Sequence, residues 1–300
     1  MIPKLLEEKI KLLYPENLED FNKIHVIKKS IRVNTLKISK KELVSRLRER
    51  FEIEEIPWCE DGLFVNDVNL TKTREYFLGY YYLQDAASMI PAIVLKPKKD
   101  DVVLDIAAAP GSKTTQMAAI MKNKGLIIAN DVNMKRLKAL RFNLQKCGVV
   151  NTVVTNLDGR YIDKIGIEFD KILLDVPCSA SGTCITNPNV FKTWNQGKVN
   201  ELSKLQKRLI EAAANCLKEG GEMVYSTCSI DPEENEEVID FAVRKLNLKT
   251  KKIRLKGIKT RDAIEKYRRF EYSEEVKNAV RINPFDNMTE GFFICKLKKY

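Results

Sequence analysis

The chain has 300 residues, of which 44% are hydrophobic, and it carries a formal net charge of +11. This size and apolar content are enough to bury a full α/β core beside a second small domain, which argues against general disorder. No run of about 18 apolar residues occurs, and residues 1–11 mix lysine with glutamate and lack a signal-peptide core. We therefore expect a cytoplasmic protein without a membrane anchor.

The charge and the cysteines narrow the chemistry further. An excess of 52 Lys and Arg over 41 Asp and Glu favours a polyanionic partner, above all nucleic acid, although a lysine-rich surface used for solubility or heat tolerance is an equal alternative. Seven cysteines without a repeated CxxC spacing and a single histidine, His25, disfavour both a disulfide framework and a zinc site. We expect no bound metal. Four cysteines are expected to be structural. Cys147, Cys216 and Cys295 fit helix or strand patterns as small hydrophobic residues, and Cys184 is expected in the core or in a loop.

Residues 1–75 are predicted to form a small α+β domain. An amphipathic helix over 2–14 precedes a strand over 29–37, a helix that Ser39 can cap, and two short strands over 51–56 and 62–65. Basic side chains on its surface would suit a phosphate backbone, with ordinary solvated charge as an equal alternative. These side chains are Arg32, Lys37, Arg46 and Arg48.

A tyrosine-rich strand then leads into a helix over 86–95. Tyr80, Tyr81 and Tyr82 could stack on bases, but adjacent aromatics in a strand alternate sides and are more often half core. Gln84 and Asp85, at the junction of strand and helix, are better candidates for contacting a ligand.

From Asp101 to the end, within a predicted second domain over 76–300, strands and helices alternate as in a doubly wound, Rossmann-like parallel sheet. The first strand, 102–106, runs into a loop of small residues that allow a ligand to approach the backbone, and Ser112 or Thr114 can open the next helix. The second strand, 126–131, ends in an acid 20 residues after Gly111, a spacing that suits a carboxylate bound to ribose hydroxyls. The loop consists of Ala107, Ala108, Ala109, Pro110, Gly111, Ser112 and Lys113.

The later strands also end in chemically capable residues, where ligands bind in open α/β sheets. A helix over 134–146 carries Arg136, and the third strand, 152–155, leads to Asp158. The fourth strand, 169–176, delivers Asp175 and then Cys178. A helix over 199–217 is expected to stop at Gly220-Gly221, before a fifth strand over 223–229 that carries Cys228 and a closing strand over 291–297.

The loop after the first strand narrows the choice of cofactor. It lacks GxGxxG, so a nicotinamide dinucleotide fits poorly, and it lacks GxxxxGK[ST], so a nucleoside triphosphate is disfavoured. A cofactor that contains adenosine but no phosphate would still need a carboxylate to bind its ribose. S-adenosyl-L-methionine is such a cofactor. The alternative for Asp131 is that it only caps the following helix. The predicted cofactor residues are 107–113, Asp131, Arg136, Asp158 and Asp175.

Three motifs in order carry a resemblance. They are Asp105-Ile-Ala-Ala-Ala-Pro-Gly-Ser-Lys113-Thr114, Asp175-Val-Pro-Cys178-Ser and Tyr225-Ser-Thr-Cys228-Ser, accompanied by similar segments at 31–36, 79–88, 233–236 and 291–293. Together they resemble the Sun (Nop/Nol/Fmu) family of S-adenosylmethionine-dependent RNA 5-methylcytosine methyltransferases. One departure is Ala180, because the family usually has a glycine directly after this Cys-Ser pair.

The chemistry of cytosine explains why such an enzyme needs a thiol. Carbon 5 is a weak nucleophile until a thiolate adds to carbon 6 and makes it enamine-like. Strand position does not choose between the two thiols, and DNA cytosine methyltransferases use a Pro-Cys after the fourth strand, which would favour Cys178. The resemblance instead implies that Cys228 attacks and that Cys178 helps to break down the covalent adduct. It also implies that Lys113 touches the cofactor or the base, while Asp175 could bond to the cytosine edge or the cofactor.

We therefore expect an RNA cytosine-5 methyltransferase that acts as a monomer, with tRNA favoured over rRNA because a compact basic chain suits a small folded RNA. Two rivals remain open. One is a DNA cytosine methyltransferase that uses Cys178, and the other is a non-catalytic RNA-binding or ribosome-assembly factor, although binding alone needs no thiol.

Overall fold

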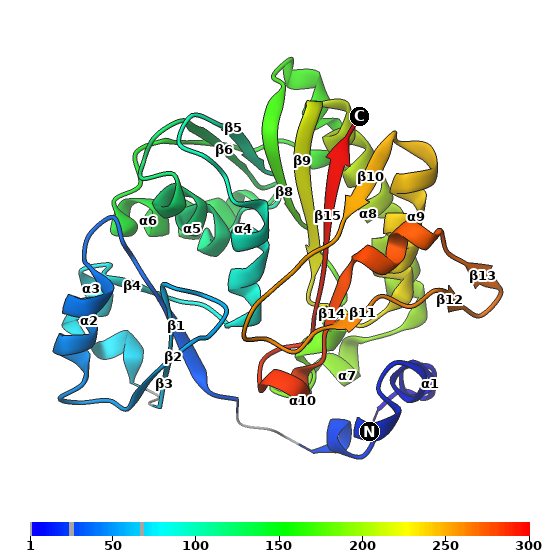
Figure 1. Ribbon diagram of the computed structural model, residues 1–300, viewed down its shortest axis with the longest axis horizontal. Helices are drawn as coiled ribbons and strands as arrows, with labels where there is room; N and C mark the ends of the chain where they lie inside the picture. Colours follow the sequence, from blue (N-terminus) through cyan, green and yellow to red (C-terminus); the bar gives the residue numbers. More distant parts are fainter. Residues whose placement is uncertain (1, 24–26, 67–68) are drawn as a thin grey trace.

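A computed structural model describes residues 2–23, 27–66 and 69–300, so His25 lies outside the described residues (Figure 1). Within them, a nine-stranded mixed sheet forms the centre of the molecule and a four-stranded antiparallel sheet lies beside it. No helix in the described part of the chain is long and apolar enough to cross a membrane.

The four-stranded sheet follows the predicted order of elements closely. Its strands, from edge to edge, are β2 (Ile53–Glu55), β3 (Gly62–Val65), β1 (Lys29–Val33) and β4 (Tyr81–Leu83). Helix α2 (Lys40–Leu47) begins after Ser39, whose Oγ accepts a hydrogen bond from the Glu42 main-chain N–H at 3.2 Å, as predicted. Tyr81 and Tyr82 are buried, which confirms the core alternative for the tyrosines. The short helix α3 (Arg74–Phe77) precedes β4.

The prediction that Arg32 lies on the surface is wrong. Its side chain is buried and donates hydrogen bonds to the Ser112 main-chain oxygen at 2.6 Å, to Thr115 Oγ1 at 2.7 Å and to the Gln84 side chain. Alternation along the strand marked Arg32 as polar but could not reveal that the start of helix α5 (Ser112–Ile120) covers that side chain. Arg32 therefore ties the small sheet to α5, whereas Lys37, Arg46 and Arg48 are exposed as expected.

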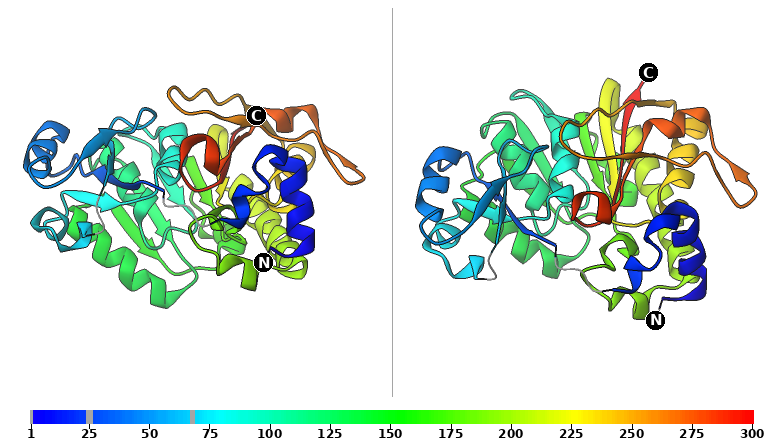
Figure 2. Two further views of the ribbon diagram at one scale, coloured as in Figure 1. Left: turned by 90° about the horizontal axis from the view of Figure 1, so that it is seen from below. Right: turned by 60° about the horizontal axis from the view of Figure 1, so that its bottom comes forward.

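The first helix, α1 (Lys4–Leu13), lies across the molecule from the small sheet that follows it in the chain (Figures 1 and 2). Its apolar side chains Leu6 and Ile10 pack in a cluster with Trp194 and Val199 of the large domain. The division of the chain at residue 75 stays a prediction.

The large sheet is parallel in its centre and antiparallel at one side. Its strands in spatial order are β11 (Arg261–Asp262), β14 (Val280–Ile282), β15 (Phe292–Lys299), β9 (Leu217–Thr227), β8 (Phe169–Asp175), β5 (Val102–Asp105), β6 (Leu126–Asn130) and β7 (Thr152–Thr155), and β10 (Leu248–Lys251) pairs with β15. The strands β7, β6, β5, β8 and β9 form the predicted Rossmann-like core, so their carboxyl ends meet at one edge.

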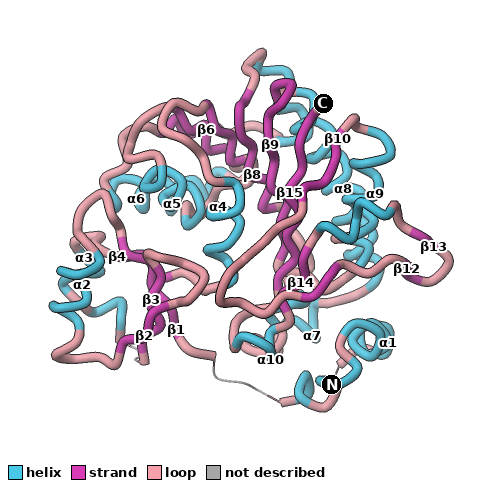
Figure 3. Tube along the Cα trace, viewed as in Figure 1, coloured by secondary structure: helices cyan, strands magenta, loops and turns pink. Residues whose placement is uncertain are grey.

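Helices cover both faces of this sheet (Figures 1 and 3). On one face lie α4 (Ile90–Leu95), α5 (Ser112–Ile120) and α6 (Met134–Cys147), and on the other lie α8 (Gln196–Asn215) and α9 (Glu236–Lys245). The short helices α7 (Val190–Thr193) and α10 (Pro284–Asn287) sit in loops, and β12 (Lys266–Tyr267) pairs with β13 (Phe270–Glu271) in a separate hairpin. The four cysteines expected to be structural are all buried.

Two local predictions are corrected. Gly111, with φ of 105°, precedes the first turn of α5, so Ser112 and Thr114 are inside the helix and neither caps it. Thr114 instead donates its hydroxyl to Asp105 Oδ2 at 2.6 Å. The long helix ends at Asn215, and Gly220-Gly221 lies within β9, where the pairing with β8 shifts register. A glycine pair indicates a break in regular secondary structure. A bulge in a strand is as compatible with such a break as the end of a helix is.

Candidate active site

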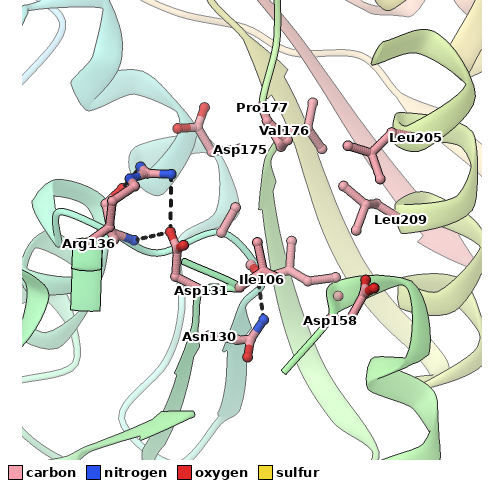
Figure 4. Close-up of a pocket in the computed structure, with 14 residues that line it drawn as sticks. Ile106, Asn130, Asp131, Arg136, Asp158, Asp175, Val176, Pro177, Leu205 and Leu209 are labelled. Carbon is pink, nitrogen blue, oxygen red and sulfur yellow. Dashed lines mark hydrogen bonds and ion pairs between the residues drawn. The ribbon is translucent and has the colours of Figure 1, made fainter. Parts of the chain in front are cut away.

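A cavity opens at the carboxyl ends of β5, β6 and β8 (Figure 4). Asp131 and Arg136 stand on one side of it, and Leu205 and Leu209 of α8 stand on the other. The lining residues are Ile106, Ala107, Ala109, Asn130, Asp131, Val132, Arg136, Asp158, Gly159, Asp175, Val176, Pro177, Leu205 and Leu209. Apolar walls with a few acids are typical of a small-molecule site.

Asp131 is held rigidly at this cavity. Its side chain is 1% exposed, its Oδ2 accepts from the Ala109 main-chain N–H at 3.2 Å, and its Oδ1 accepts from the Asn133 N–H at 2.8 Å. Arg136 Nη1 lies 3.3 Å from the same Oδ2. The role of helix cap for α6 belongs to Asn133, whose Oδ1 accepts from Lys135 and Arg136.

Only part of the predicted cofactor set lines the cavity. Ala107, Ala109, Asp131, Arg136, Asp158 and Asp175 do so, whereas Ala108, Pro110, Gly111, Ser112 and Lys113 do not. Asp158 is also engaged elsewhere, because Arg160 Nη2 lies 2.5 Å from its Oδ2 and lowers the pKa of this carboxyl.

The second half of the site lies where β8 and β9 end side by side. The register pairs Asp175 with Ser226, whose hydroxyl donates to Asp175 Oδ1 at 2.7 Å. Lys113 reaches the same carboxylate from the first turn of α5, with 2.7 Å between Nζ and Oδ2, and it also bonds Ser88 Oγ at 2.8 Å. The carboxylate is therefore held from two sides while its side chain remains 28% exposed.

The two thiols that the sequence singled out meet at this edge. Cys178 Sγ lies 3.3 Å from Cys228 Sγ, and both side chains are partly buried. Hydrogen bonding to Cys228, together with burial, raises the pKa of the Cys178 thiol well above its ordinary value. Cys178 thus keeps its proton at neutral pH and can act as a proton donor beside a second sulfur.

The loop after Cys178 makes the close approach possible. Gly182 donates its N–H to the Cys228 main-chain oxygen at 2.9 Å, and a Cβ at Gly182 would lie 2.8 Å from that oxygen. Ala180, where the resembled family usually has glycine, adopts φ of 58° and ψ of 23°. This left-handed conformation explains the usual glycine and costs an alanine about 1 kcal/mol.

Comparison with known proteins places this geometry in a family. A family model described as 16S rRNA methyltransferase RsmB/F matches residues 92–298, and one described as the N-terminal domain of 16S rRNA methyltransferase RsmF matches residues 2–86. The chain belongs to the RsmB/F methyltransferase family. This confirms the resemblance to the Sun family and the expectation of a methyltransferase.

Named relatives of this family act on two kinds of RNA. The chain is 48% identical to the tRNA (cytosine(49)-C(5))-methyltransferase of Pyrococcus abyssi, covering 91% of this chain and 88% of the relative. It is 43% identical to ribosomal RNA small subunit methyltransferase F of Vibrio parahaemolyticus, over 79% of this chain and 52% of the relative, so it spans about half the length of that protein.

Solved structures agree with the fold of the RsmB/F chain. A methyltransferase homologue from Pyrococcus horikoshii matches with a TM-score of 0.89 and 37% identity, covering 99% of this chain and 95% of that one. NSun6 from the same organism, solved with the S-adenosylmethionine analogue SFG, matches with a TM-score of 0.88 and 27% identity, covering 99% and 98% of the two chains.

Sequence reasoning missed several residues of this site. Ser88 and Ser226 hold Lys113 and Asp175, and Pro177 and Leu205 form apolar walls of the cavity. Ser226 had a usable signal, because it lies two residues before Cys228 on the strand expected beside the one that delivers Asp175. Leu205 had none, since its position in a helical stripe fits any core.

Proposed function

We propose that this protein is an S-adenosylmethionine-dependent RNA cytosine-5 methyltransferase that acts on tRNA. One observation carries the proposal: two thiols 3.3 Å apart stand at the ends of adjacent strands, next to a carboxylate that lysine and serine hold. Methylation of a pyrimidine through a thiol adduct needs a nucleophile, and it needs an acid or base that transfers protons beside the same edge of the ring. RNA binding alone needs neither.

The cavity fits the proposed cofactor. Asp131 offers a buried, fixed carboxylate at the end of β6, where it would accept hydrogen bonds from ribose hydroxyls. Val132, Pro177 and Leu205 provide apolar surface for an adenine ring, and Asp175 is shared between this cavity and the thiols. When bound, S-adenosylmethionine supplies an electrophilic methyl group on a sulfonium.

Cys228 acts as the nucleophile in this proposal. Its thiolate adds to carbon 6 of cytosine, and the electron pair of the carbon 5–carbon 6 double bond moves to carbon 5. Carbon 5 would then take the methyl group, whose bond to the sulfonium sulfur breaks and leaves its electron pair on that sulfur. The proton on carbon 5 must next leave for a base. Its electron pair restores the double bond and expels the sulfur of Cys228 as a thiolate.

The neighbours of Cys228 support this sequence of steps. Ser226 and Lys113 orient the carboxyl group of Asp175, which supports a role for Asp175 in hydrogen bonding to the N3 and N4 edge of the base. Cys178 keeps a proton beside the sulfur that must leave, which suits a role in breakdown of the adduct. Lys113 holds Asp175 in place through their ion pair.

The proposal is tested by methyl transfer. The protein is incubated with methyl-labelled S-adenosylmethionine and a set of tRNA transcripts, and the modified position is read by bisulfite sequencing. We expect 5-methylcytosine in tRNA from the unmodified protein and none from Cys228→Ala. Methylation of cytosine-containing DNA but not RNA would contradict the proposal, and so would binding of RNA without methylation of any RNA.

The preference for tRNA rests on the share of each relative that is matched. The Pyrococcus relative named for tRNA is covered over 88% of its length, whereas the Vibrio relative named for rRNA is covered over 52%. We propose further that the protein acts in the cytoplasm as a monomer. Competition between tRNA and small-subunit rRNA transcripts tests the preference, and light scattering of the free protein tests the oligomeric state.

A further inference from the structure

A buried cluster of serines and acids lies directly behind the two thiols. Ser179 follows Cys178 and Ser229 follows Cys228 in the sequence, and their hydroxyl oxygens are 3.1 Å apart. Both hydroxyls reach the same Glu234 oxygen, at 2.5 Å and 2.6 Å respectively. The Ser179 main-chain N–H also donates to Glu234 Oε1 at 3.0 Å. One carboxyl group therefore joins the two loops that carry the sulfurs.

A second acid reinforces this junction. Asp231 is fully buried, and its Oδ2 lies 2.6 Å from Ser181 Oγ, 3.1 Å from Ser229 Oγ and 3.1 Å from the indole nitrogen of Trp194. Ser181 belongs to the loop after Cys178, and it also accepts from the Ile230 main-chain N–H at 3.0 Å. Burial and the nearby charge of Asp231 raise the pKa of the Glu234 carboxyl, so the charge that a cation would balance in this cluster is chiefly that of Asp231.

Lys9 of helix α1 supplies that cation from the other end of the chain. Its Nζ lies 2.5 Å from Asp231 Oδ1 and 2.9 Å from Glu233 Oε2, and the side chain is 1% exposed. Trp194 covers it, with Nζ 5.1 Å from the ring centroid. A lysine is almost never fully buried unless it is paired, so this contact is specific.

The directions in which the pKa values of Lys9 and Asp231 shift are those of an ion pair. Burial opposes the charge on Lys9, but the Asp231 and Glu233 carboxylates outweigh it and raise the pKa of the ammonium group. Burial likewise opposes ionisation of Asp231, yet Lys9 and the hydroxyl donors lower the pKa of that carboxyl. Lys9 and Asp231 are thus an ion pair, and the other carboxylate oxygen of Asp231 contacts Ser181 and Ser229.

We propose that Lys9 is a positioning residue that fixes the distance between the two thiols, acting through Asp231 on the loops after Cys178 and Cys228. The inference rests on the proposed function, because that function gives the thiol distance its importance. It assigns the N-terminal helix, which touches neither cavity nor thiol in the contacts above, a part in the chemical step. A displacement of reacting groups by about 1 Å can lower the rate of the chemical step roughly 100-fold.

The test compares Lys9→Met with Lys11→Met, a matched change of an exposed lysine on the same helix. We expect Lys9→Met to lower kcat for RNA methylation by about 100-fold while KM for RNA and the Kd for S-adenosylmethionine change by less than about threefold. Lys11→Met should keep the kcat of the unmodified protein. A general structural role would instead weaken cofactor binding, RNA binding and catalysis together.

A second readout needs no methylation at all. Diamide oxidises two neighbouring thiols to a disulfide and takes up the two electrons and two protons, so its rate with Cys178 and Cys228 reports their approach. Lys9→Met should slow this reaction about tenfold relative to Lys11→Met. Because the assay is independent of RNA, a failure of the proposed function would leave the diamide result intact.

The double variant Lys9→Met with Asp231→Asn is the control for misfolding. It removes the carboxylate of Asp231 together with the cation that balances it. We expect it to unfold at a higher temperature than Lys9→Met and to regain part of both rates. Diamide and methylation rates in Lys9→Met equal to those of Lys11→Met would overturn the inference. So would a double variant that regains thermal stability but neither rate.

Discussion

The two halves of the site share one sheet edge but are built in different ways. In the cofactor half, short-range contacts hold Asp131, which bonds to Asn133, two residues away, and to Ala109, 22 residues away. The thiol half joins residues that are 50 or more positions apart, such as Cys178 with Cys228, and Lys9 lies 222 positions from Asp231. The carboxylate of Asp131 is therefore fixed within one local unit, although Leu205 and Leu209 of α8 complete the wall of its cavity. The geometry of the two thiols instead depends entirely on contacts between distant parts of the chain.

The largest effect is predicted for Asp175, which the thiol half shares with the cofactor cavity. Asp175→Ala removes the carboxylate that is proposed to hydrogen-bond the base, and it leaves the Lys113 ammonium group without its carboxylate partner. We therefore expect kcat to fall about 1000-fold. Steady-state kinetics at saturating cofactor and tRNA measure it. Glu219→Ala, at an exposed acid, is the control. A change confined to the KM for cofactor would show that Asp175 belongs to the cofactor half instead.

The next effect is on stability and concerns Asp105, which lies behind the cofactor half. Burial raises the pKa of this carboxyl to about 7. The unfolded chain releases the proton near pH 4 and the folded chain near pH 7, so the free energy of unfolding falls as pH rises through that window. Asp105→Asn removes this fall.

Urea unfolding at pH 4.5 and pH 8 measures the difference for Asp105. Between these values we expect the unmodified protein to lose about 3 kcal/mol more stability than Asp105→Asn. The exposed Asp100→Asn should behave like the unmodified protein. Equal losses in Asp105→Asn and the unmodified protein would refute this prediction.

The cofactor half is tested by Asp131→Ala. We expect the Kd for S-adenosylmethionine to rise about 30-fold, because the variant loses hydrogen bonds to a charged acceptor worth about 2 kcal/mol. At saturating cofactor, kcat should fall less than about fivefold, since the thiols lie on the other half. Isothermal titration and kinetics together check both numbers. A fall in kcat as deep as that of Asp175→Ala would erase the distinction between the halves.

The smallest effect is predicted for Asp158. Its carboxylate is one-third exposed and already paired with Arg160, so Asp158→Asn should change the Kd for S-adenosylmethionine less than about threefold. The same titration as for Asp131→Ala measures it. A tenfold loss would mean that Asp158 leaves Arg160 when the cofactor binds.

More of the cofactor half than of the thiol half could be predicted from the sequence. Strands β5, β6 and β8 and the acids that follow them were readable because buried parallel strands are continuous apolar runs and their ends carry polar residues. Arg32 and the glycine pair Gly220-Gly221 were misread, since each pattern is compatible with two environments and only the packed fold chooses between them.

The geometry of the thiol half could not be predicted from the sequence, because it depends on contacts between residues far apart in the chain. Lys9 looks like one of many lysines on an amphipathic helix, and its burial depends on a contact with a residue 222 positions later. Cys178 and Cys228 could be named as candidates, but the strand pattern could not show that their sulfurs meet at 3.3 Å. The choice between them came from the resemblance and remains a proposal.

The most direct test of the central claim is a search for a covalent protein–RNA adduct on denaturing gels. The unmodified protein, Cys178→Ala, Cys228→Ala and the buried control Cys184→Ala are each incubated with S-adenosylmethionine and substrate tRNA. We expect Cys178→Ala to accumulate an adduct, Cys228→Ala to form none, and Cys184→Ala to behave like the unmodified protein. An adduct that accumulates in Cys228→Ala and is absent in Cys178→Ala would contradict it.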